Sequence, residues 1–285
     1  MPRPWTEFIQ SQCLPWRTPP AGTLADGLRW KVLSSDDETG ELTALVAIPA
    51  GWRVTEKGFN AAPEEFFVLS GDLTINKIVY GLHDYAFLPA GYERTATSED
   101  GAVVMAFFHG APAFASGAAP AGLYDPGLLI ERIVTRLQPW DSANVDPKIN
   151  HLHAHRKNLR LDPNGTCRTY LLGGLPHGFS PSGTAHKETH PHVEEFFMVS
   201  GDMSCTMVGS MRPGAYFWRP PGFEHGLDSS LTGFLLLCRT PGANKTVSVW
   251  SADAYPVNDA APYNPILPPE FAAIKPTDLA VALTY

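Results

Sequence analysis

Short apolar runs separated by turn-forming residues recur along the chain. One run, EEFFVLSGD, begins at Glu64 and ends in Ser-Gly-Asp, where Gly71 permits the positive φ of a tight turn. A further strand-length run, a Pro-x-Gly turn and the apolar run VVMAFFH from Val103 come next. Short runs between turns spaced roughly 8 to 12 residues apart are typical of β-sandwiches and barrels. The pattern therefore predicts an all-β fold.

One segment departs from this pattern. Residues 128–137, LLIERIVTRL, follow a stretch rich in Ala, Gly and Pro, and they predict one short helix. No other part of the chain indicates a long amphipathic helix.

The strand pattern occurs twice. The string PEEFFVLSGDLT from Pro63 has a counterpart, VEEFFMVSGDMS, that begins 130 residues later at Val193. The string FLPAGYERT from Phe87 matches WRPPGFEHG, which begins 131 residues later at Trp218. Two matches in the same order and at nearly the same offset indicate an internal duplication.

The chain is long enough for two domains. Its 285 residues are 44% hydrophobic and 18% charged, which is typical of globular proteins with buried cores. We expect an N-terminal domain over residues 1–125 and a C-terminal domain over residues 126–285. The C-terminal domain should end in an extended, proline-rich tail that lies on a barrel or on a partner chain.

The charge of the chain argues against a polyanionic partner. Its formal net charge is −8, whereas nucleic-acid-binding proteins present a basic face. We therefore expect neither a nucleic acid nor a membrane as partner, and no stretch has the apolar length that spans a bilayer. The four cysteines are far apart and lack CxxC spacing, which predicts reduced thiols in a cytoplasmic protein.

The second copy of the repeat carries a known motif. Gly214, Pro220, Gly222 and His225 stand at every fixed position of G-x5-P-x-G-x2-H, the second motif of the cupin superfamily. The chain thus resembles the cupins over both repeats. The resemblance implies two tandem cupin barrels of the double-stranded β-helix, or jelly-roll, type: a bicupin.

The first cupin motif, H-x-H-x(3,4)-E-x6-G, is present with one change. Glu188, His190, Glu194 and Gly201 stand at its fixed positions, so a glutamate replaces the first histidine. The local string ETHPHVEEFFMVSG is most similar to the cupin domain of ChrR-type anti-sigma proteins. By this resemblance, the metal ligands of the C-terminal barrel are Glu188, His190, Glu194 and His225.

These donors suit a divalent metal ion. Residues i and i+2 of a strand face the same side, so Glu188 and His190 can both point into a barrel. Two imidazoles and two carboxylates suit Fe(II), Mn(II), Ni(II) or Zn(II), with room left for water or substrate.

Each candidate has an alternative role. His190 and His225 would otherwise be barrel histidines bonded to the backbone, and Glu194 a buried acid beside an arginine. Glu188 would otherwise be a solvated residue at a strand end, with His186 or His192 replacing it as ligand. His192 is also the candidate catalytic acid or base, and a surface imidazole is the alternative for it and for His186.

The N-terminal repeat lacks this set of donors. Aligned through Gly71, its corresponding residues are Gly58, Asn60, Glu64 and Arg94, so only the carboxylate is retained. A guanidinium has no lone pair for a metal. We expect Arg94 to pair with Glu64 in the position of the ion, and the N-terminal barrel to bind no metal.

The resemblance leaves the activity open, because cupins include dioxygenases, isomerases, decarboxylases, hydrolases and non-catalytic binding proteins. Our first hypothesis is a metal-dependent enzyme, a non-haem dioxygenase, whose small oxygen-bearing substrate chelates the C-terminal metal. Phe196, Phe217, Trp218 and Phe223 are candidates for the wall of its pocket, with core packing as their alternative.

Two other functions remain open. One is a cupin isomerase, lyase or hydrolase, and the other is a non-catalytic, ChrR-like sensor of a metal or ligand. Because exposed sheet edges invite pairing between chains, we also expect a homodimer.

Overall fold

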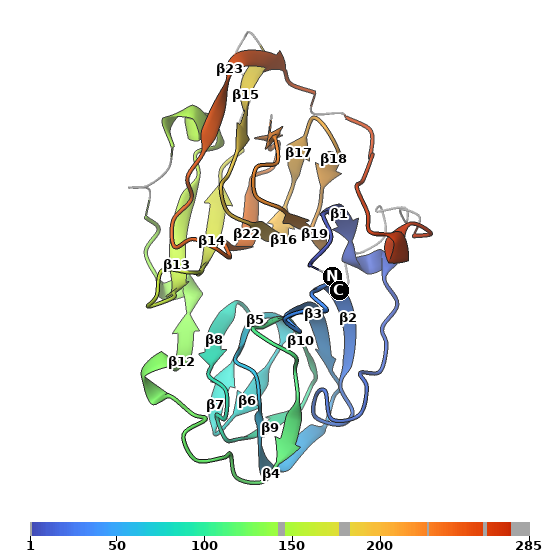
Figure 1. Ribbon diagram of the computed structural model, residues 1–285, viewed down its shortest axis with the longest axis vertical. Coiled ribbons are helices and arrows are strands. Elements are labelled where there is room, and N and C mark those ends of the chain that lie inside the picture. Colours follow the sequence, from blue (N-terminus) through green and yellow to red (C-terminus); the bar gives the residue numbers. More distant parts are fainter. Residues whose placement is uncertain (1, 142–145, 177–182, 227, 259–260, 275–285) are drawn as a thin grey trace. The chain divides into compact units, whose positions relative to one another are not determined.

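The regular secondary structure of the described residues is almost entirely β-strand. The computed structural model describes residues 2–141, 146–176, 183–226, 228–258 and 261–274. Over these residues the strands are joined by loops and short 3-10 turns (Figure 1), and none of the helices has the length and apolar composition needed to cross a membrane. The all-β prediction is confirmed.

The chain divides into two compact units. Among the described residues, unit 1 contains residues 2–4 and Leu14–Gln138, and unit 2 contains Trp5–Cys13 and those between 139 and 274. These extents differ from the expected ranges of 1–125 and 126–285, because a short segment before each repeat is placed in the other unit.

Unit 1 consists of two antiparallel sheets around an apolar core. The larger sheet has the strand order β12-β8-β5-β10-β3-β2, and the smaller has β11-β4-β9-β6-β7. Val46 and Phe66 from the first sheet share the core with Leu73 and Ile75 from the second. The elements of unit 1 are β2 (Arg29–Ser35), β3 (Leu42–Ile48), β4 (Trp52–Asn60), β5 (Glu64–Gly71), β6 (Leu73–Ile75), β7 (Ile78–Tyr80), β8 (Asp84–Leu88), β9 (Arg94–Ser98), β10 (Ala102–Phe108), β11 (Phe114–Ser116), β12 (Ile130–Val134) and the 3-10 turns Pro126–Leu128 and Thr135–Leu137.

Unit 2 repeats this plan. Its six-stranded sheet has the order β1-β19-β16-β22-β14-β13, and two three-stranded sheets, β20-β15-β23 and β18-β17-β21, complete it. Phe8, Phe196 and Leu236 belong to its core. The elements of unit 2 are β1 (Thr6–Gln10), β13 (His155–Leu161), β14 (Arg168–Gly174), β15 (Thr184–Thr189), β16 (Glu194–Gly201), β17 (Met203–Cys205), β18 (Gly209–Met211), β19 (Ala215–Arg219), β20 (His225–Gly226), β21 (Asp228–Ser229), β22 (Phe234–Arg239), β23 (Val249–Pro256) and the 3-10 turns Ser11–Cys13, Pro147–Leu152 and Pro269–Phe271.

The duplication seen in the sequence is present in the sheets. In unit 1, β5 lies between β8 and β10, and in unit 2 its counterpart β16 lies between β19 and β22. The turns after β5 and β16 both require glycine: Gly71 and Gly201 have φ of 68° and 83°. A Cβ at either position would overlap a backbone carbonyl oxygen, that of Gly101 or of Gly233.

Each large sheet is completed by a strand that precedes the other unit in the sequence. Strand β1, before unit 1, pairs with β19 of unit 2, with Thr6 opposite Trp218 (Figure 1). Strand β12, before unit 2, pairs with β8 of unit 1, with Ile130 opposite Phe87. Because Phe87 and Trp218 are equivalent in the repeat, β1 and β12 occupy equivalent edges.

The prediction of a short helix over residues 128–137 is wrong. The segment forms β12 and a single 3-10 turn instead. Its β-branched residues pair with the edge of β8, and Arg132 forms an ion pair with the buried carboxylate of Asp84, Nη2 to Oδ2 2.7 Å. The available sheet edge and the buried charge outweigh a weak helical pattern.

The proline-rich tail lies on unit 2, as predicted, as far as the structure describes it. Tyr263 donates a hydrogen bond to the carbonyl oxygen of Phe8 at 2.8 Å, and Ile266 forms a β-bridge with Glu7. The last part of the tail, residues 275–285, lies outside the described residues. The homodimer stays a prediction.

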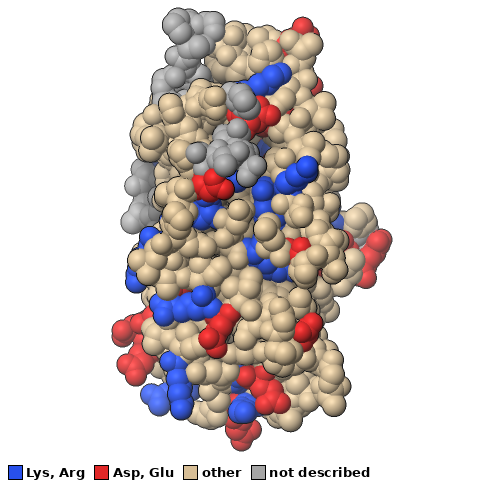
Figure 2. All heavy atoms as spheres, turned by 90° about the vertical axis from the view of Figure 1, so that its left-hand side faces the viewer, with Lys and Arg blue, Asp and Glu red and all other residues tan. Residues whose placement is uncertain are grey.

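Two further features concern the surface charge and the cysteines. Basic and acidic side chains are both spread over the face shown in Figure 2, so this face offers no continuous basic surface. All four cysteines are free thiols.

Candidate metal centre

The four predicted ligands lie together in unit 2. Glu188 is near the end of β15, His190 follows that strand, Glu194 begins β16 and His225 begins β20. Strands β15 and β20 are paired with Glu188 directly opposite His225, which brings two motifs distant in sequence together. All four side chains line a cavity of about 330 Å³.

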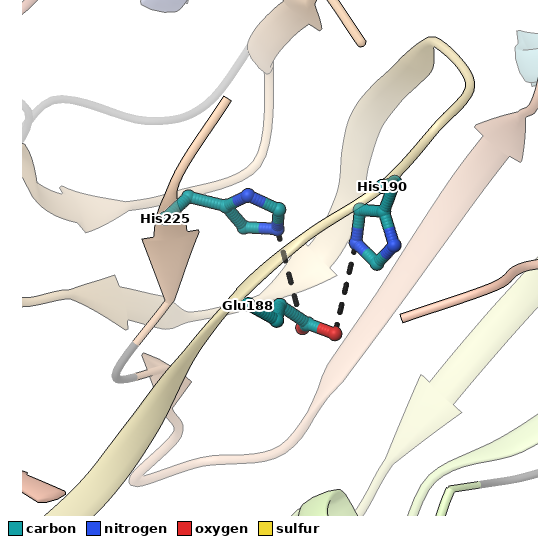
Figure 3. Close-up of side chains that lie close together, drawn as sticks. All are labelled: Glu188, His190 and His225. Atoms are coloured by element: carbon teal, nitrogen blue, oxygen red, sulfur yellow. Dashed lines mark ion pairs between the residues drawn. The ribbon is translucent and has the colours of Figure 1, made fainter. Parts of the chain in front are cut away.

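Glu188 faces both imidazoles. Its Oε2 is 3.7 Å from Nε2 of His190, and its Oε1 is 4.0 Å from Nε2 of His225 (Figure 3). One donor atom from each of these three residues lies within 4.8 Å of the other two. Such a group can hold a metal ion.

Glu194 contacts the same two imidazoles and an arginine. Its Oε1 is 3.0 Å from Nε2 of His190, and its Oε2 is 3.2 Å from Nε2 of His225. Nη1 of Arg219 donates a hydrogen bond to Oε2 at 2.6 Å. The two alternatives for Glu194, metal ligand and buried acid beside an arginine, are therefore compatible.

Backbone carbonyls fix the orientation of both imidazoles. Nδ1 of His190 is 2.8 Å from the carbonyl oxygen of Val247, and Nδ1 of His225 is 3.0 Å from that of Phe223. A carbonyl only accepts, so each Nδ1 carries a hydrogen and each Nε2 faces the carboxylates. This is the usual arrangement of imidazoles that bind a metal through Nε2.

The centre concentrates charge in a buried place. Burial raises the pKa of Glu188, and the nearby Glu194 raises it further. Burial also raises the pKa of Glu194, but His225 and His190 hold it well below its usual value. Burial lowers the pKa of His190, while Glu194 and Glu188 overcome this effect and raise it to about 9. Two close carboxylates therefore depend on a nearby positive charge.

The residues fit a divalent metal. Donors about 2.1 Å from one ion are separated by roughly 3.0 to 4.2 Å, and the four nitrogen–oxygen distances run from 3.0 to 4.0 Å. Nε2 of His190 is buried and makes no well-directed hydrogen bond within the described chain. A divalent cation would displace the proton that the raised pKa keeps on His190, bind the freed lone pair of Nε2 and relieve the repulsion between the carboxylates.

His192 and His186 are not brought into this group. His192 is buried, its Nδ1 is 3.0 Å from the carbonyl oxygen of Val193, and its Nε2 accepts from the backbone N–H of Val247 at 3.2 Å. Neither histidine is among the residues that line the cavity. With both ring nitrogens bonded to backbone, His192 has no open site for proton transfer, and its ring stacks on His190.

The predicted aromatic wall is half present. Phe196 and Phe217 line the cavity, whereas Trp218 and Phe223 do not. Tyr170 lines it as well.

The sequence did not point to several charged residues of the site. Arg156 lines the cavity, and Arg219 links Glu194 to Glu7. The need of a buried carboxylate for a partner is the signal that leads to Arg219. No local pattern leads to Glu7, because it lies 212 residues from Arg219 in the chain.

The equivalent position in unit 1 is filled by an ion pair. Nη2 of Arg94 is 2.5 Å from Oε1 of Glu64, and Nδ2 of Asn60 donates to Oε2 of Glu64 at 3.0 Å. The predicted pairing of Arg94 with Glu64 is confirmed. The mostly apolar cavity beside them is small, about 80 Å³.

Jelly-roll barrels of antiparallel strands, one of them with a His/Glu centre inside, define the cupin class of fold. The model of the ChrR cupin-like domain family matches residues 6–113, which include most of unit 1 and exclude the candidate metal centre. No curated protein sequence matches the chain.

Solved structures resemble the chain over both units. A provisionally assigned dioxygenase from Nostoc punctiforme is 20% identical, with a TM-score of 0.74 and coverage of 87% of each chain. A variant of oxalate decarboxylase from Bacillus subtilis is 12% identical, with a TM-score of 0.52, and the match covers 85% of this chain and 78% of that one. At these identities the similarity shows the cupin fold and leaves the reaction open.

Proposed function

We propose that the chain is a metal-dependent enzyme, a non-haem dioxygenase that acts on a small oxygen-bearing organic substrate in unit 2. One observation carries this proposal: two imidazoles and two carboxylates meet in the wall of a cavity of about 330 Å³. A purely structural metal site is closed by protein ligands, whereas a catalytic one keeps access for substrate.

The roles of the residues follow from their contacts. Glu188, His190, Glu194 and His225 would hold Fe(II), Mn(II), Ni(II) or Zn(II), and the bound ion would supply Lewis acidity or oxygen activation. Phe196 and Phe217 present apolar surface that excludes water from the cavity.

Arg156 suggests how a substrate is oriented. Its buried side chain lines the same cavity, with Cζ 5.7 Å from the centre of the Tyr170 ring. A guanidinium in this position suits a carboxylate or enolate oxygen. The similarity to the provisionally assigned dioxygenase, over 87% of both chains, supports oxidation ahead of isomerisation or hydrolysis.

A second candidate function is the sensing of a metal or ligand without catalysis. The match of residues 6–113 to the ChrR cupin-like domain favours it. The two functions differ in turnover, because a sensor binds the metal and consumes no oxygen.

Metal content and oxygen uptake together test the proposal. The purified chain is loaded in turn with Fe(II), Mn(II), Ni(II) or Zn(II) and screened in an oxygen electrode against 1,3-diketones, phenols and hydroxy acids. We expect metal-dependent uptake with one substrate class and none in His225→Ala. Tight metal binding without uptake would favour the sensor, and absence of metal binding would contradict both functions.

A further inference from the structure

We infer that strand β1, at the start of the chain, is a working part of the metal centre, and that Glu7 is a positioning residue that sets the metal ligand Glu194 through Arg219. This inference rests on the proposed metal function of unit 2. It assigns a role to a segment that lies outside both cupin motifs.

Arg219 is shared between two carboxylates. Its Nε donates to Oε2 of Glu7 at 3.0 Å, its Nη2 forms a short ion pair with Oε1 of Glu7, and its Nη1 donates to Oε2 of Glu194 at 2.6 Å. Glu7, Arg219 and Glu194 are 4%, 5% and 5% exposed. The three charged groups are therefore largely shielded from bulk solvent and depend on one another as partners.

The way Arg219 divides its hydrogen bonds between Glu7 and Glu194 decides which oxygens of Glu194 are available to a metal. The guanidinium is a rigid, planar fork, and Glu7 occupies Nε and Nη2. Arg219 is then left with Nη1 for a single oxygen of Glu194, while the other oxygen, Oε1, faces His190. Without Glu7, the fork can turn toward both oxygens of Glu194 and compete with the ion for them.

Strand β1 fixes the position of Glu7. The strand pairs with β19, which carries Arg219, and the backbone N–H of Glu7 donates to the carbonyl oxygen of Ile266 at 2.7 Å. On the side-chain level, Nε1 of Trp5 donates to Oε2 of Glu7 at 3.1 Å.

The residue directly before this strand supports a second ligand. The ring of Trp5 packs against Phe223. The carbonyl oxygen of Phe223 is the atom that fixes Nδ1 of His225. The start of the chain thus reaches two of the four candidate ligands, each through one intermediate residue.

Unit 1 provides an internal comparison. Leu88 is opposite Glu64 in the sheet, as Arg219 is opposite Glu194 in unit 2. Glu64 takes its arginine from the ligand position, where Arg94 fills the site. In unit 2 the arginine comes from the neighbouring strand β19 and leaves the ligand position to a histidine. The Glu7–Arg219 pair therefore occurs in the unit that retains the donor set.

Mn(II) binding to the full-length protein tests the inference. Isothermal titration calorimetry gives the affinity, and electron paramagnetic resonance reports the environment of the bound ion. We expect Glu7→Gln to weaken Mn(II) binding by about tenfold or more and to change the spectrum, as loss of an outer partner of a ligand usually does. The matched control is Glu131→Gln, which changes the exposed glutamate of β12 in unit 1 and should leave affinity unchanged.

A double variant separates positioning from a general structural role. Adding Arg219→Gln to Glu7→Gln removes the competing fork, so the double variant should bind Mn(II) more tightly than Glu7→Gln alone. If Glu7→Gln does not fold, Trp5→Phe removes the hydrogen bond to Glu7 and should weaken binding by about threefold.

The outcomes are distinguishable. A folded Glu7→Gln protein with affinity within about twofold of wild type, or a double variant weaker than the single one, would overturn the inference. Wild-type protein that binds no Mn(II), Fe(II), Ni(II) or Zn(II) would instead overturn the proposed function itself.

Discussion

Glu194 belongs to two networks of the molecule at once. On one side it meets Nε2 of His190 and His225, and on the other it meets Arg219 of β19, which also lines the cavity. The arginine stabilises the carboxylate from strand β19, without occupying the ligand position that His225 holds. In unit 1 the equivalent Glu64 is neutralised from the cavity side by Arg94, which leaves no place for an ion. The two barrels therefore differ in the position from which an arginine reaches this glutamate.

His225 is the ligand with no nearby substitute. Glu188, His190 and Glu194 lie within seven residues of chain, whereas the second motif supplies His225 alone; Glu224 points away to an exposed ion pair with Lys187. We expect His225→Ala to abolish tight metal binding while the fold survives. Glu188→Gln should weaken binding less, because an amide oxygen still donates.

Mass spectrometry of metal content, alongside circular dichroism, checks both variants. Arg94→Ala, at the equivalent position in unit 1, is the matched control and should retain full occupancy. Full occupancy in His225→Ala would mean that the metal is bound elsewhere.

Acidification should expose the contribution of Glu7 to stability. Burial raises the pKa of Glu7, but the nearby charge and hydrogen bonds of Arg219 more than offset this effect. The pKa of Glu7 in the folded protein therefore lies below the ordinary value of 4.5. A carboxyl whose pKa is lower in the folded than in the unfolded protein stabilises the fold at pH values above its unfolded-state pKa. This stabilisation is lost as the pH falls from about 4.5 through the pKa of Glu7 in the folded protein. Metal-free Glu7→Gln should therefore be less stable near neutral pH, by about 1–3 kcal/mol.

Urea unfolding between pH 3 and pH 7 measures this effect as a difference. Other carboxylates titrate in both proteins, so the gap between wild type and Glu7→Gln isolates Glu7, and it should close as the pH falls. Parallel stability profiles would show that the pair with Arg219 does not stabilise the fold.

At the level of single residues, the structure brings together the four side chains that the motifs single out, while their role as metal ligands stays a prediction. His190, His225 and both glutamates meet because their spacing places them at strand ends that face one cavity. The role first given to His192 has no support in the geometry, since its two ring nitrogens are bonded to backbone. Sequence spacing does not reveal such backbone contacts, because they depend on where the distant Val247 is placed.

At the scale of elements, the turn after the duplicated strand is a strict requirement of the fold. Gly201 has a φ of 83°, and a Cβ there would overlap the carbonyl oxygen of Gly233. We expect Gly201→Ala to destabilise the protein by roughly 2–4 kcal/mol, because strain and overlap add. Thermal unfolding measures the loss.

Gly51 supplies the control for this turn. Its φ is 75°, but a Cβ there meets nothing within 4 Å, so Gly51→Ala tests the cost of the positive φ alone. That cost should be about 1 kcal/mol. Equal losses in the two variants would show that the overlap at Gly201 is relieved by movement of the neighbouring strand.

The edge strands were harder to predict than the central strands of each sheet. Strands β5, β16 and β10 could be predicted because their apolar runs are strong and bounded by turns. The segment that became β12 looked helical, and β1 was not recognised as part of the second barrel. Both are edge strands whose conformation depends on a distant sheet, so their local sequence carries little of the information.

For the whole molecule we predict one metal ion per chain, bound in unit 2. Arg94 and Asn60 surround the only carboxylate that unit 1 retains at its equivalent position, and neither supplies a donor set for a metal. Equilibrium dialysis with Mn(II) should saturate at one equivalent. Saturating metal should also raise the unfolding temperature, because the ion binds the native state alone.

Variants of each unit test whether the single metal ion is bound in unit 2. His190→Ala should remove the single equivalent, and Glu64→Gln should leave it in place. A second tight equivalent that disappears in Glu64→Gln would show that unit 1 also binds a metal.

Because a chain is synthesised from its N-terminus, the edge strands β1 and β12 wait for different times before they can pair with their sheets. Strand β12 emerges from the ribosome directly after the rest of unit 1, so the first barrel can close early. Strand β1 is made before the rest of unit 2, and Arg219 follows Glu7 by 212 residues. At about 5–20 residues per second, β1 waits roughly 10–40 s for its sheet.

During that interval Phe8 and Ile9, each only 1% exposed in the folded chain, are in contact with water. A nascent chain that stalls before β19 thus displays an unpaired apolar strand, the kind of segment that aggregates or recruits chaperones.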